Sequence, residues 1–187
     1  MRVLTGKLKG RLLKSPKLGL RPTQDKTRKA VFDILGEAIV GVQFLDLFAG
    51  SGAVGIEALS CGAANVWFVE NDRESLAILK DNLSKLNIVN YEVLPKDAFS
   101  AIEQFAQSKR KFDIIFLDPP YYQELAKKSL LSLGSCDILN PSGLVIIQHF
   151  KKDIIPEKTD SLELFKQKKY GDTLVSFYQM RPKFTER

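Results

Sequence analysis

The sequence predicts an α/β protein built on a doubly wound, mostly parallel sheet. Three observations favour this fold. From residue 44 onward, short apolar runs alternate with segments of helical periodicity, and such alternation requires crossover connections between parallel strands. A glycine-rich turn, Gly50 to Gly55, joins the first of these strands to its helix. The length of 187 residues and the hydrophobic content of 44% suit a globular chain of ordinary domain size.

The expected elements follow in chain order. Residues 2–13 predict two short strands that turn at Gly6 or Gly10, and a helix is expected to begin near Thr23. The alternating part predicts strands at 44–48, 65–69, 91–94, 112–117 and 143–149, and helices at 53–61, 73–86, 98–107 and 123–133. Residues 162–169 and 173–180 predict an antiparallel hairpin that closes one edge of the sheet. We therefore expect a small N-terminal extension, residues 1–40, that packs on a core domain, residues 41–187.

Composition excludes several classes of protein. The longest apolar runs are far shorter than the roughly 20 residues that a membrane-spanning helix needs. The N-terminus lacks the apolar segment of a secretory signal. Cys61 and Cys136 are the only cysteines, too few for a disulfide framework or a zinc site of four cysteines. We expect a cytoplasmic protein that does not contact a membrane.

Positive charge is concentrated at the N-terminus. The net charge is +6, but residues 1–29 hold ten Lys and Arg and one acid, whereas the rest holds 18 basic and 21 acidic residues. Clustered positive charge attracts nucleic-acid phosphates because binding releases condensed counterions. A solvated tail that aids solubility is the alternative, but the alternating pattern favours a hairpin. The expected nucleic-acid contacts here are Lys7, Lys9, Arg11, Lys14 and Arg28.

A glycine pattern lies between the first predicted strand and its helix. Gly50, Gly52 and Gly55 spell G-x-G-x-x-G, which lets a ligand approach the backbone at a helix N-terminus. Several nucleotide-cofactor families share this motif, and a simple tight turn is the alternative. Asp46 precedes Gly50 by four residues. Its carboxylate can accept a hydrogen bond from a ligand ammonium or from the loop's own amides.

Two further acids follow the next two strands. Glu70 ends strand 65–69, roughly 20 residues past the glycine turn, where a carboxylate can bind a ribose diol; an exposed strand end is the alternative. Asn71 and Asp72 follow it and are expected to cap the next helix. Asp97 follows the third strand and fits two roles equally well, an acceptor for an adenine amine or a helix N-cap.

The fourth strand of the alternating part ends in Asp118-Pro119-Pro120-Tyr121. Two prolines lack N–H groups and prevent further strand pairing, so the chain must leave the sheet at its carboxyl end. That end is where α/β sheets bind ligands. An acid, backbone carbonyls and an aromatic ring suit a planar substrate with an –NH2 group, and a stiff turn is the alternative.

These motifs together resemble the Rossmann-like, S-adenosylmethionine-dependent methyltransferases that act on amino nitrogens. More closely, the chain resembles the RsmD family of 16S rRNA guanine-N2 methyltransferases over nearly its whole length. The basic N-terminal segment joined to Leu20-Arg21-Pro22-Thr23 is the specific part. Gln148-His149 departs from the pattern, because an acid is expected there in many relatives. The matching segments are RVLTGKLKGRLL, LRPT with TRKAVFDIL, DLFAGSGAVGIEALSCGA, FVEND, DPPY and the terminal hairpin.

The resemblance implies a cofactor site and a substrate site. Gly50, Ser51 and Gly52 would wrap the methionine end of the cofactor, Glu70 would hold its ribose, and Asp97 with Ala98 would bind its adenine. The implied cofactor residues are Asp46, Phe48, Ala49, Gly50, Ser51, Gly52, Glu70, Asn71, Asp97 and Ala98. The implied catalytic residues, which would hold the guanine, are Asp118, Pro119, Pro120 and Tyr121. Arg21 and Thr23 would lie near the cleft and contact RNA or order the cofactor.

The resemblance also implies the partner and the chemistry. A monomer would methylate 16S ribosomal RNA, free or within an assembling or assembled 30S subunit. Methyl transfer from a sulfonium needs no metal ion, and His149, on an apolar strand, is interpreted as structural. Three alternatives stay open: a nicotinamide oxidoreductase, an amino-methyltransferase acting on DNA adenine or a protein amide, and a non-catalytic RNA-binding protein.

Overall fold

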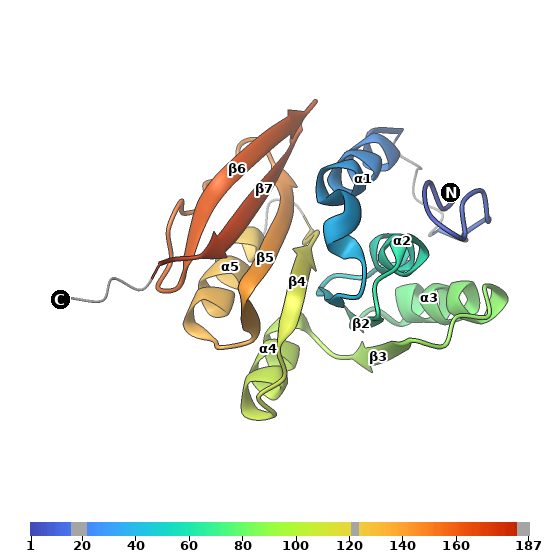
Figure 1. The fold of residues 1–187 in the computed structure, drawn as a ribbon, viewed down its shortest axis with the longest axis horizontal. Helices are drawn as coiled ribbons and strands as arrows, with labels where there is room; N and C mark the ends of the chain where they lie inside the picture. The colour runs from blue at the N-terminus through green and yellow to red at the C-terminus, as the bar shows by residue number, and fades with distance from the viewer. Residues whose placement is uncertain (16–21, 121–123, 183–187) are drawn as a thin grey trace.

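The computed structural model describes residues 1–15, 22–120 and 124–182 (Figure 1). Seven strands form one sheet in the order β3-β2-β1-β4-β5-β7-β6. Strands β1 to β5 are parallel, and β7 lies antiparallel between β5 and β6. The predicted fold class, a doubly wound sheet with an antiparallel C-terminal hairpin, is confirmed.

Most element boundaries agree with the periodicity of the sequence. Helix α1 begins at Pro22, one residue before the predicted start, and β1 leaves the sheet two residues early. Strand β5 begins four residues early and contains Pro141, at a shift of register between β4 and β5. The elements are α1 (Pro22–Leu35), η1 (Gly36–Ile39), β1 (Gln43–Asp46), α2 (Ala53–Cys61), β2 (Asn65–Glu70), α3 (Arg73–Lys85), β3 (Tyr91–Pro95), α4 (Ala98–Gln107), β4 (Phe112–Leu117), α5 (Leu125–Ser135), β5 (Leu139–Phe150), β6 (Leu162–Tyr170) and β7 (Thr173–Met180).

Helices cover both faces of the sheet, so its central strands are apolar on both sides. Helices α1, α2 and α3 share one core cluster with Phe44, Phe68 and Phe116. Helices α4 and α5 share the other with Leu45 and Trp67. Consecutive strand residues thus enter opposite cores. The chain order reverses between β1 and β4, and the carboxyl ends of strands at such a switch point are where open α/β sheets bind ligands.

The N-terminal segment differs from the predicted pair of strands. One antiparallel bridge, between Arg2 and Leu12, stands where two strands were expected. The reason is that backbone N–H groups of this segment bond to α2: those of Leu4 and Thr5 donate to Glu57, and that of Leu8 donates to Ser60 Oγ. The segment packs on the core through buried side chains, but the domain boundary at residue 40 stays a prediction.

Close packing explains why residue 6 of this segment is a glycine. Gly6 has a φ of 70°, and a Cβ there would lie 1.9 Å from the carbonyl oxygen of Ser60. Only a residue without a side chain lets the turn lie directly against the end of α2.

Across the described ranges, no helix is both long and apolar enough to span a membrane.

Candidate functional site

The glycine turn between β1 and α2 forms one wall of a pocket. Gly50 and Gly52 both have positive φ angles, 53° and 82°, which glycine adopts without strain. A Cβ on Gly50 would meet nothing within 4 Å, whereas one on Gly52 would lie 2.3 Å from Leu79 Cδ1. A Cβ on Gly55 would lie 2.2 Å from Phe68 Cε1. Gly50 is therefore open to a ligand, while Gly52 and Gly55 let α2 pack closely.

Asp46 lies behind this turn and is 1% exposed. Its Oδ2 accepts a hydrogen bond from Gly55 N at 3.0 Å. The sequence left two donors open, a ligand ammonium and an amide of the loop, and the structure shows the bond from the loop amide. Asp46 does not line the pocket. Burial raises the pKa of Asp46 to about 7; the bond from Gly55 opposes this, and the negative charges of Asp118 and Glu70 add to it.

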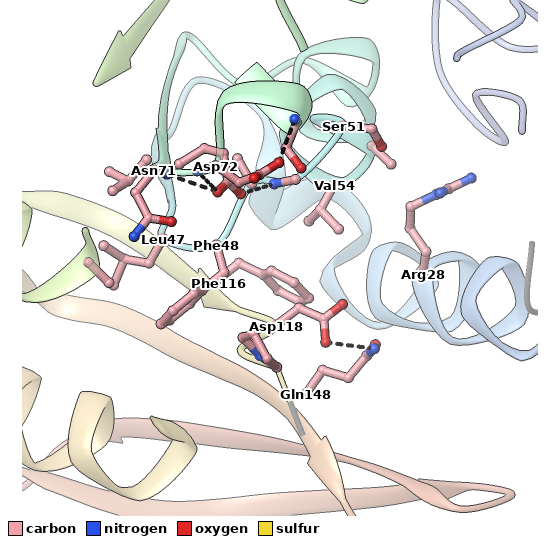
Figure 2. A pocket seen from close by; sticks show the side chains of 18 of the residues that line it. Arg28, Leu47, Phe48, Ser51, Val54, Asn71, Asp72, Phe116, Asp118 and Gln148 are labelled. Atoms are coloured by element: carbon pink, nitrogen blue, oxygen red, sulfur yellow. Dashed lines mark hydrogen bonds between the residues drawn. The ribbon is translucent and has the colours of Figure 1, made fainter. Parts of the chain in front are cut away.

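Glu70 connects the ends of the first two parallel strands. Its Oε2 accepts from Gly50 N at 2.7 Å, and its Oε1 accepts from Asn71 N and Asp72 N at 2.8 Å each. A carboxylate has about four acceptor positions, so these three bonds leave room for a ligand hydroxyl. Figure 2 shows these bonds beside the N-terminus of α3, which Asp72 caps by accepting from Ser75 N.

Asp97 caps helix α4 and also lines the pocket. It accepts hydrogen bonds from Phe99 N at 3.1 Å and Ser100 N at 3.0 Å, and a third from the Ser100 hydroxyl. The bond from the Ser100 hydroxyl, together with the two backbone bonds, holds the pKa of Asp97 below its usual value. Ala98, the first residue of α4, lines the same wall. The cap role is thus present, and a contact to adenine stays a prediction.

Asp118 stands at the end of β4, beside the neighbouring strand β5. Gln148 Nε2 donates a hydrogen bond to Asp118 Oδ1 at 3.0 Å (Figure 2). Burial raises the pKa of Asp118 to about 7, and the bond from Gln148 works against this rise. Pro120 lines the pocket, whereas the buried Pro119 does not. Tyr121, which the sequence also assigned to this site, lies outside the described residues.

The pocket has a volume of about 740 Å³, within the usual range for small-molecule sites. It lies over the carboxyl ends of β1, β2, β4 and β5, and Figure 2 shows Phe48 and Phe116 between the Asn71–Asp72 turn and the Asp118–Gln148 pair. Of the predicted cofactor residues, all but Asp46 and Gly52 line it: Phe48, Ala49, Gly50, Ser51, Glu70, Asn71, Asp97 and Ala98. The structure thus brings both predicted sites into one cavity.

Arg28 lines the pocket, but its guanidinium is already held by groups of the protein, and a contact to RNA stays a prediction. Arg28 is 6% exposed and forms an ion pair with Glu57, whose Oε2 lies 3.2 Å from its Nε. Its other partners are Asp25 and the carbonyl oxygen of Arg2, 2.7 Å from Nη2. Because Glu57 also accepts from Leu4 and Thr5, this buried cluster joins the N-terminal segment to the helix behind the glycine turn.

The other predicted RNA contacts have mixed positions. Lys7 and Lys9 are exposed. Arg11 donates to the carbonyl oxygen of Lys85, and Lys14 forms an ion pair of 2.8 Å with Asp81 on α3. Arg21 lies outside the described residues, as does the side chain of Thr23 in the first turn of α1.

Sequence reasoning did not place Gln148 and Phe116 in the pocket lining, nor Glu57 in the buried cluster with Arg28. The parallel pairing of β4 with β5 places Gln148 beside Asp118, a signal that was available once both strands were assigned. Glu57 offered no local signal, because its partners lie more than 25 residues away in the chain. His149 is buried and bonds to Ser176 Oγ at 2.9 Å, and burial lowers its pKa, which agrees with a structural role.

Known proteins resemble this chain along nearly its whole length. The family model described as "Conserved hypothetical protein 95" matches residues 1–179. YlbH of Bacillus subtilis, described as a candidate rRNA methyltransferase, is 36% identical over 97% of this chain and 100% of the relative. Ribosomal RNA small subunit methyltransferase D of Escherichia coli is 34% identical over 96% of this chain and 89% of its own length.

Solved structures extend this similarity to the fold. Escherichia coli yhhF, described as a candidate methyltransferase, superposes with a TM-score of 0.86 at 33% identity, covering 97% of this chain and 98% of that one. The sheet order and the pocket at its switch point define a protein of the Rossmann-like methyltransferase class. Within that class, the chain belongs to the family of the matched model, the RsmD family.

Proposed function

We propose that the protein transfers a methyl group from S-adenosylmethionine to the exocyclic N2 amine of a guanine in 16S ribosomal RNA. The proposal includes a monomeric enzyme whose substrate is the RNA, free or within a 30S subunit. One observation carries it: Asp118 lies in the same cavity as Gly50 and Glu70, with its carboxylate held by Gln148. The name of the Escherichia coli relative, a small subunit methyltransferase, supports ribosomal RNA as the substrate.

The residues present suit S-adenosylmethionine, which supplies a methyl group on a positively charged sulfur. Gly50 leaves its side of the turn open, and Glu70 keeps acceptor capacity for ribose hydroxyls. Asp46, Glu70 and Asp118 end three neighbouring strands, and the negative charges of Asp118 and Glu70 add to the cost of ionising Asp46. A cationic ligand relieves that cost, because an opposite charge nearby favours the ionised carboxyl.

Asp118 provides the acceptor for the substrate amine. Since its Oδ1 accepts from Gln148, Oδ2 is the oxygen for an N–H of the guanine amine, and the Pro119 carbonyl is the proposed second acceptor. These bonds favour a more tetrahedral nitrogen and aim its lone pair at the methyl carbon. Positioning of this kind can supply much of the reduction in barrier. The amine becomes acidic after transfer, so a carboxyl with a pKa of about 7 can hold the released proton.

The target base must leave its stack to reach the pocket. Asp118 is half-buried at the end of β4, and a guanine within a helix cannot place its amine there. An unpaired or extruded nucleotide is therefore the form of substrate that the cavity admits.

Methyl transfer from tritiated S-adenosylmethionine tests the proposal. The acceptors are 16S rRNA and 30S subunits from cells that lack the protein, followed by nucleoside analysis. We expect the label in N2-methylguanosine, and its loss in Asp118→Ala while cofactor binding stays nearly intact. Asp137→Ala, which removes an exposed acid outside the pocket, is the matched control. Label in methyladenosine alone, or a loss below about tenfold (about 1.4 kcal/mol) in Asp118→Ala, contradicts the assignment.

A further inference from the structure

The sheet face that carries the pocket continues past Gln148 to the edge strand β6. In the antiparallel register Gln148 pairs with Val175, and Val175 pairs with Lys168. Residues paired in this way have their side chains on the same face. Lys168 therefore stands on the pocket's face, two strand spacings or about 10 Å from Gln148.

Two further β6 residues share this face, because side chains alternate along a strand. Lys166 pairs with Phe177, and its Nζ lies 5.9 Å from the centroid of the Phe177 ring. Tyr170 packs against the same core cluster as Phe177. Lys168 is exposed, while Lys166 and Tyr170 are partly exposed. We call Lys166, Lys168 and Tyr170 the β6 row.

The strand that carries the β6 row supplies no ion-pair partner for its lysines. Residues 164–171 contain three lysines and no acid. Of the acids that flank them, Asp172 pairs with Lys151 at 2.6 Å, and Glu163 accepts from Gln179 at 3.1 Å near the opposite end of the strand. Among the described residues, no ion pair involves Lys166 or Lys168.

We propose that the β6 row is a docking surface for the backbone of the substrate RNA, next to the nucleotide that enters the pocket. This inference rests on the proposed function and adds a second contact region for the same substrate. A cationic strip with an aromatic ring is the arrangement that follows single-stranded nucleic acid, with lysines on phosphates and the ring available to a base. A count of charges does not reveal this cationic strip, because residues 30–187 together hold more acidic than basic residues.

The location complements the basic N-terminal segment. Figure 1 shows α1 between the β6–β7 hairpin and the N-terminal segment, which lies beside α2 and α3. The two basic regions thus lie on opposite sides of α1, which lines the pocket through Arg28, Val31 and Phe32. An RNA that places one base against Asp118 can contact Lys168, whereas Lys7 lies at the C-terminal end of α2, where its backbone N–H donates to the carbonyl oxygen of Ser60 at 2.8 Å.

Edge-strand lysines also have a protective role that must be separated from docking. Charges on an edge strand discourage pairing with another chain. That role predicts self-association when the lysines are neutralised, with no effect on RNA affinity or on its salt dependence.

The test compares two double variants with equal changes of charge. Lys166→Gln/Lys168→Gln changes the β6 row, and Lys127→Gln/Lys128→Gln changes two exposed residues of α5 on the opposite face. RNA affinity is measured with 16S rRNA from cells lacking the protein, between 0.1 M and 1 M salt. Removing one lysine–phosphate pair should lower the slope of log affinity against log salt by about 0.7. Removing two such pairs should lower the slope by about 1.4. If the variant and the wild type bind equally at 1 M salt, the affinity of the variant at 0.1 M salt should then be up to about 25-fold lower than that of the wild type.

We expect the β6 variant alone to lose RNA affinity and methyl transfer at limiting RNA, with unchanged affinity for S-adenosylmethionine. Equal affinity and slope in the two variants would overturn the docking surface, whether or not the β6 variant self-associates. In that case a wild-type protein that still methylates 16S rRNA leaves the proposed function intact. A wild-type protein that neither binds nor methylates the RNA removes both.

Discussion

Replacing Gln148 with leucine should shift the titration of Asp118 to higher pH. Gln148 is 5% exposed, and its Nε2 donates to Asp118 Oδ1 at 3.0 Å. Leucine keeps a buried side chain of similar size on β5 but removes this donor. A hydrogen bond to a charged group contributes about 1.5–3 kcal/mol, and one pKa unit corresponds to about 1.4 kcal/mol. Since Asp118 is only half-buried, we take the lower end and expect a rise of about one unit above the wild-type value of about 7.

Carbon-13 NMR of carboxyl-labelled aspartate follows this titration in the free protein, with Asp118→Asn assigning the resonance. Glu70 from β2 and Arg28 from α1 also line the pocket, and Asp46 from β1 lies behind its glycine turn. All three are unchanged in this comparison. Because kcat/KM reports groups of the free enzyme, its rise with pH should move by the same amount. Coincident midpoints for the wild type and Gln148→Leu would refute the role of this hydrogen bond.

Three other changes test separate parts of the structure. Glu70→Ala should weaken binding of S-adenosylmethionine and its demethylated product, measured by calorimetry without metal; unchanged affinity would remove Glu70 from the site. Neutralising Lys7, Lys9, Arg11 and Lys14 together should lower RNA affinity and flatten its salt dependence by up to about 0.7–0.9 for each cation–phosphate pair removed, and a normal slope would indicate a solubility tail. Arg28→Met, which leaves Glu57 buried without its cation, should lower the free energy of unfolding by about 3–5 kcal/mol in denaturant titrations, and a change below about 1 kcal/mol would contradict the buried pair.

Local signals in the sequence were sufficient for most of the fold. Helix 98–107 was predicted to the residue because Asp97 supplies a side-chain cap directly before it. Strand 112–117 was predicted to the residue because it is apolar except for Asp113 and is followed by Asp118 and two prolines. The early start of β5 was missed, since the sequence Asn140-Pro141-Ser142-Gly143 is typical of a turn. There the shift of register with β4 accommodates the proline, and register is a property of the pair of strands.

The residues of the site also fall into two groups, those that local sequence signals predict and those that depend on contacts between distant segments. Glu70 and Asp118 were found because each ends a predicted strand, and parallel strand ends meet at one edge of the sheet. The contact of Gln148 with Asp118 follows only from the pairing of β4 with β5, and the Arg28–Glu57 pair gives no local signal, because these contacts join segments 26 to 53 residues apart. For Arg28, the count of positive charges does not reveal that its guanidinium also pairs with a buried acid.

The distribution of charge is consistent with the proposed function, in which one surface receives both a cationic cofactor and a polyanion. The acids Asp46, Glu70 and Asp118 lie at the strand ends under the pocket, where burial raises the pKa of Asp46 and Asp118 to about 7. Both pKa values exceed that of an unfolded chain, so these groups bind more protons when folded and their contribution to stability is lost as pH rises from about 4 through about 7. A positive ligand lowers those pKa values and restores stability, whereas a phosphate close to the same acids would raise them further. RNA phosphates are therefore best held away from the pocket floor, and the exposed Lys7, Lys9 and Lys168 all lie outside the pocket lining. On this argument the cofactor should stabilise the protein more at pH 8 than at pH 5, and equal thermal shifts at the two pH values would show that the buried acids do not sense its charge.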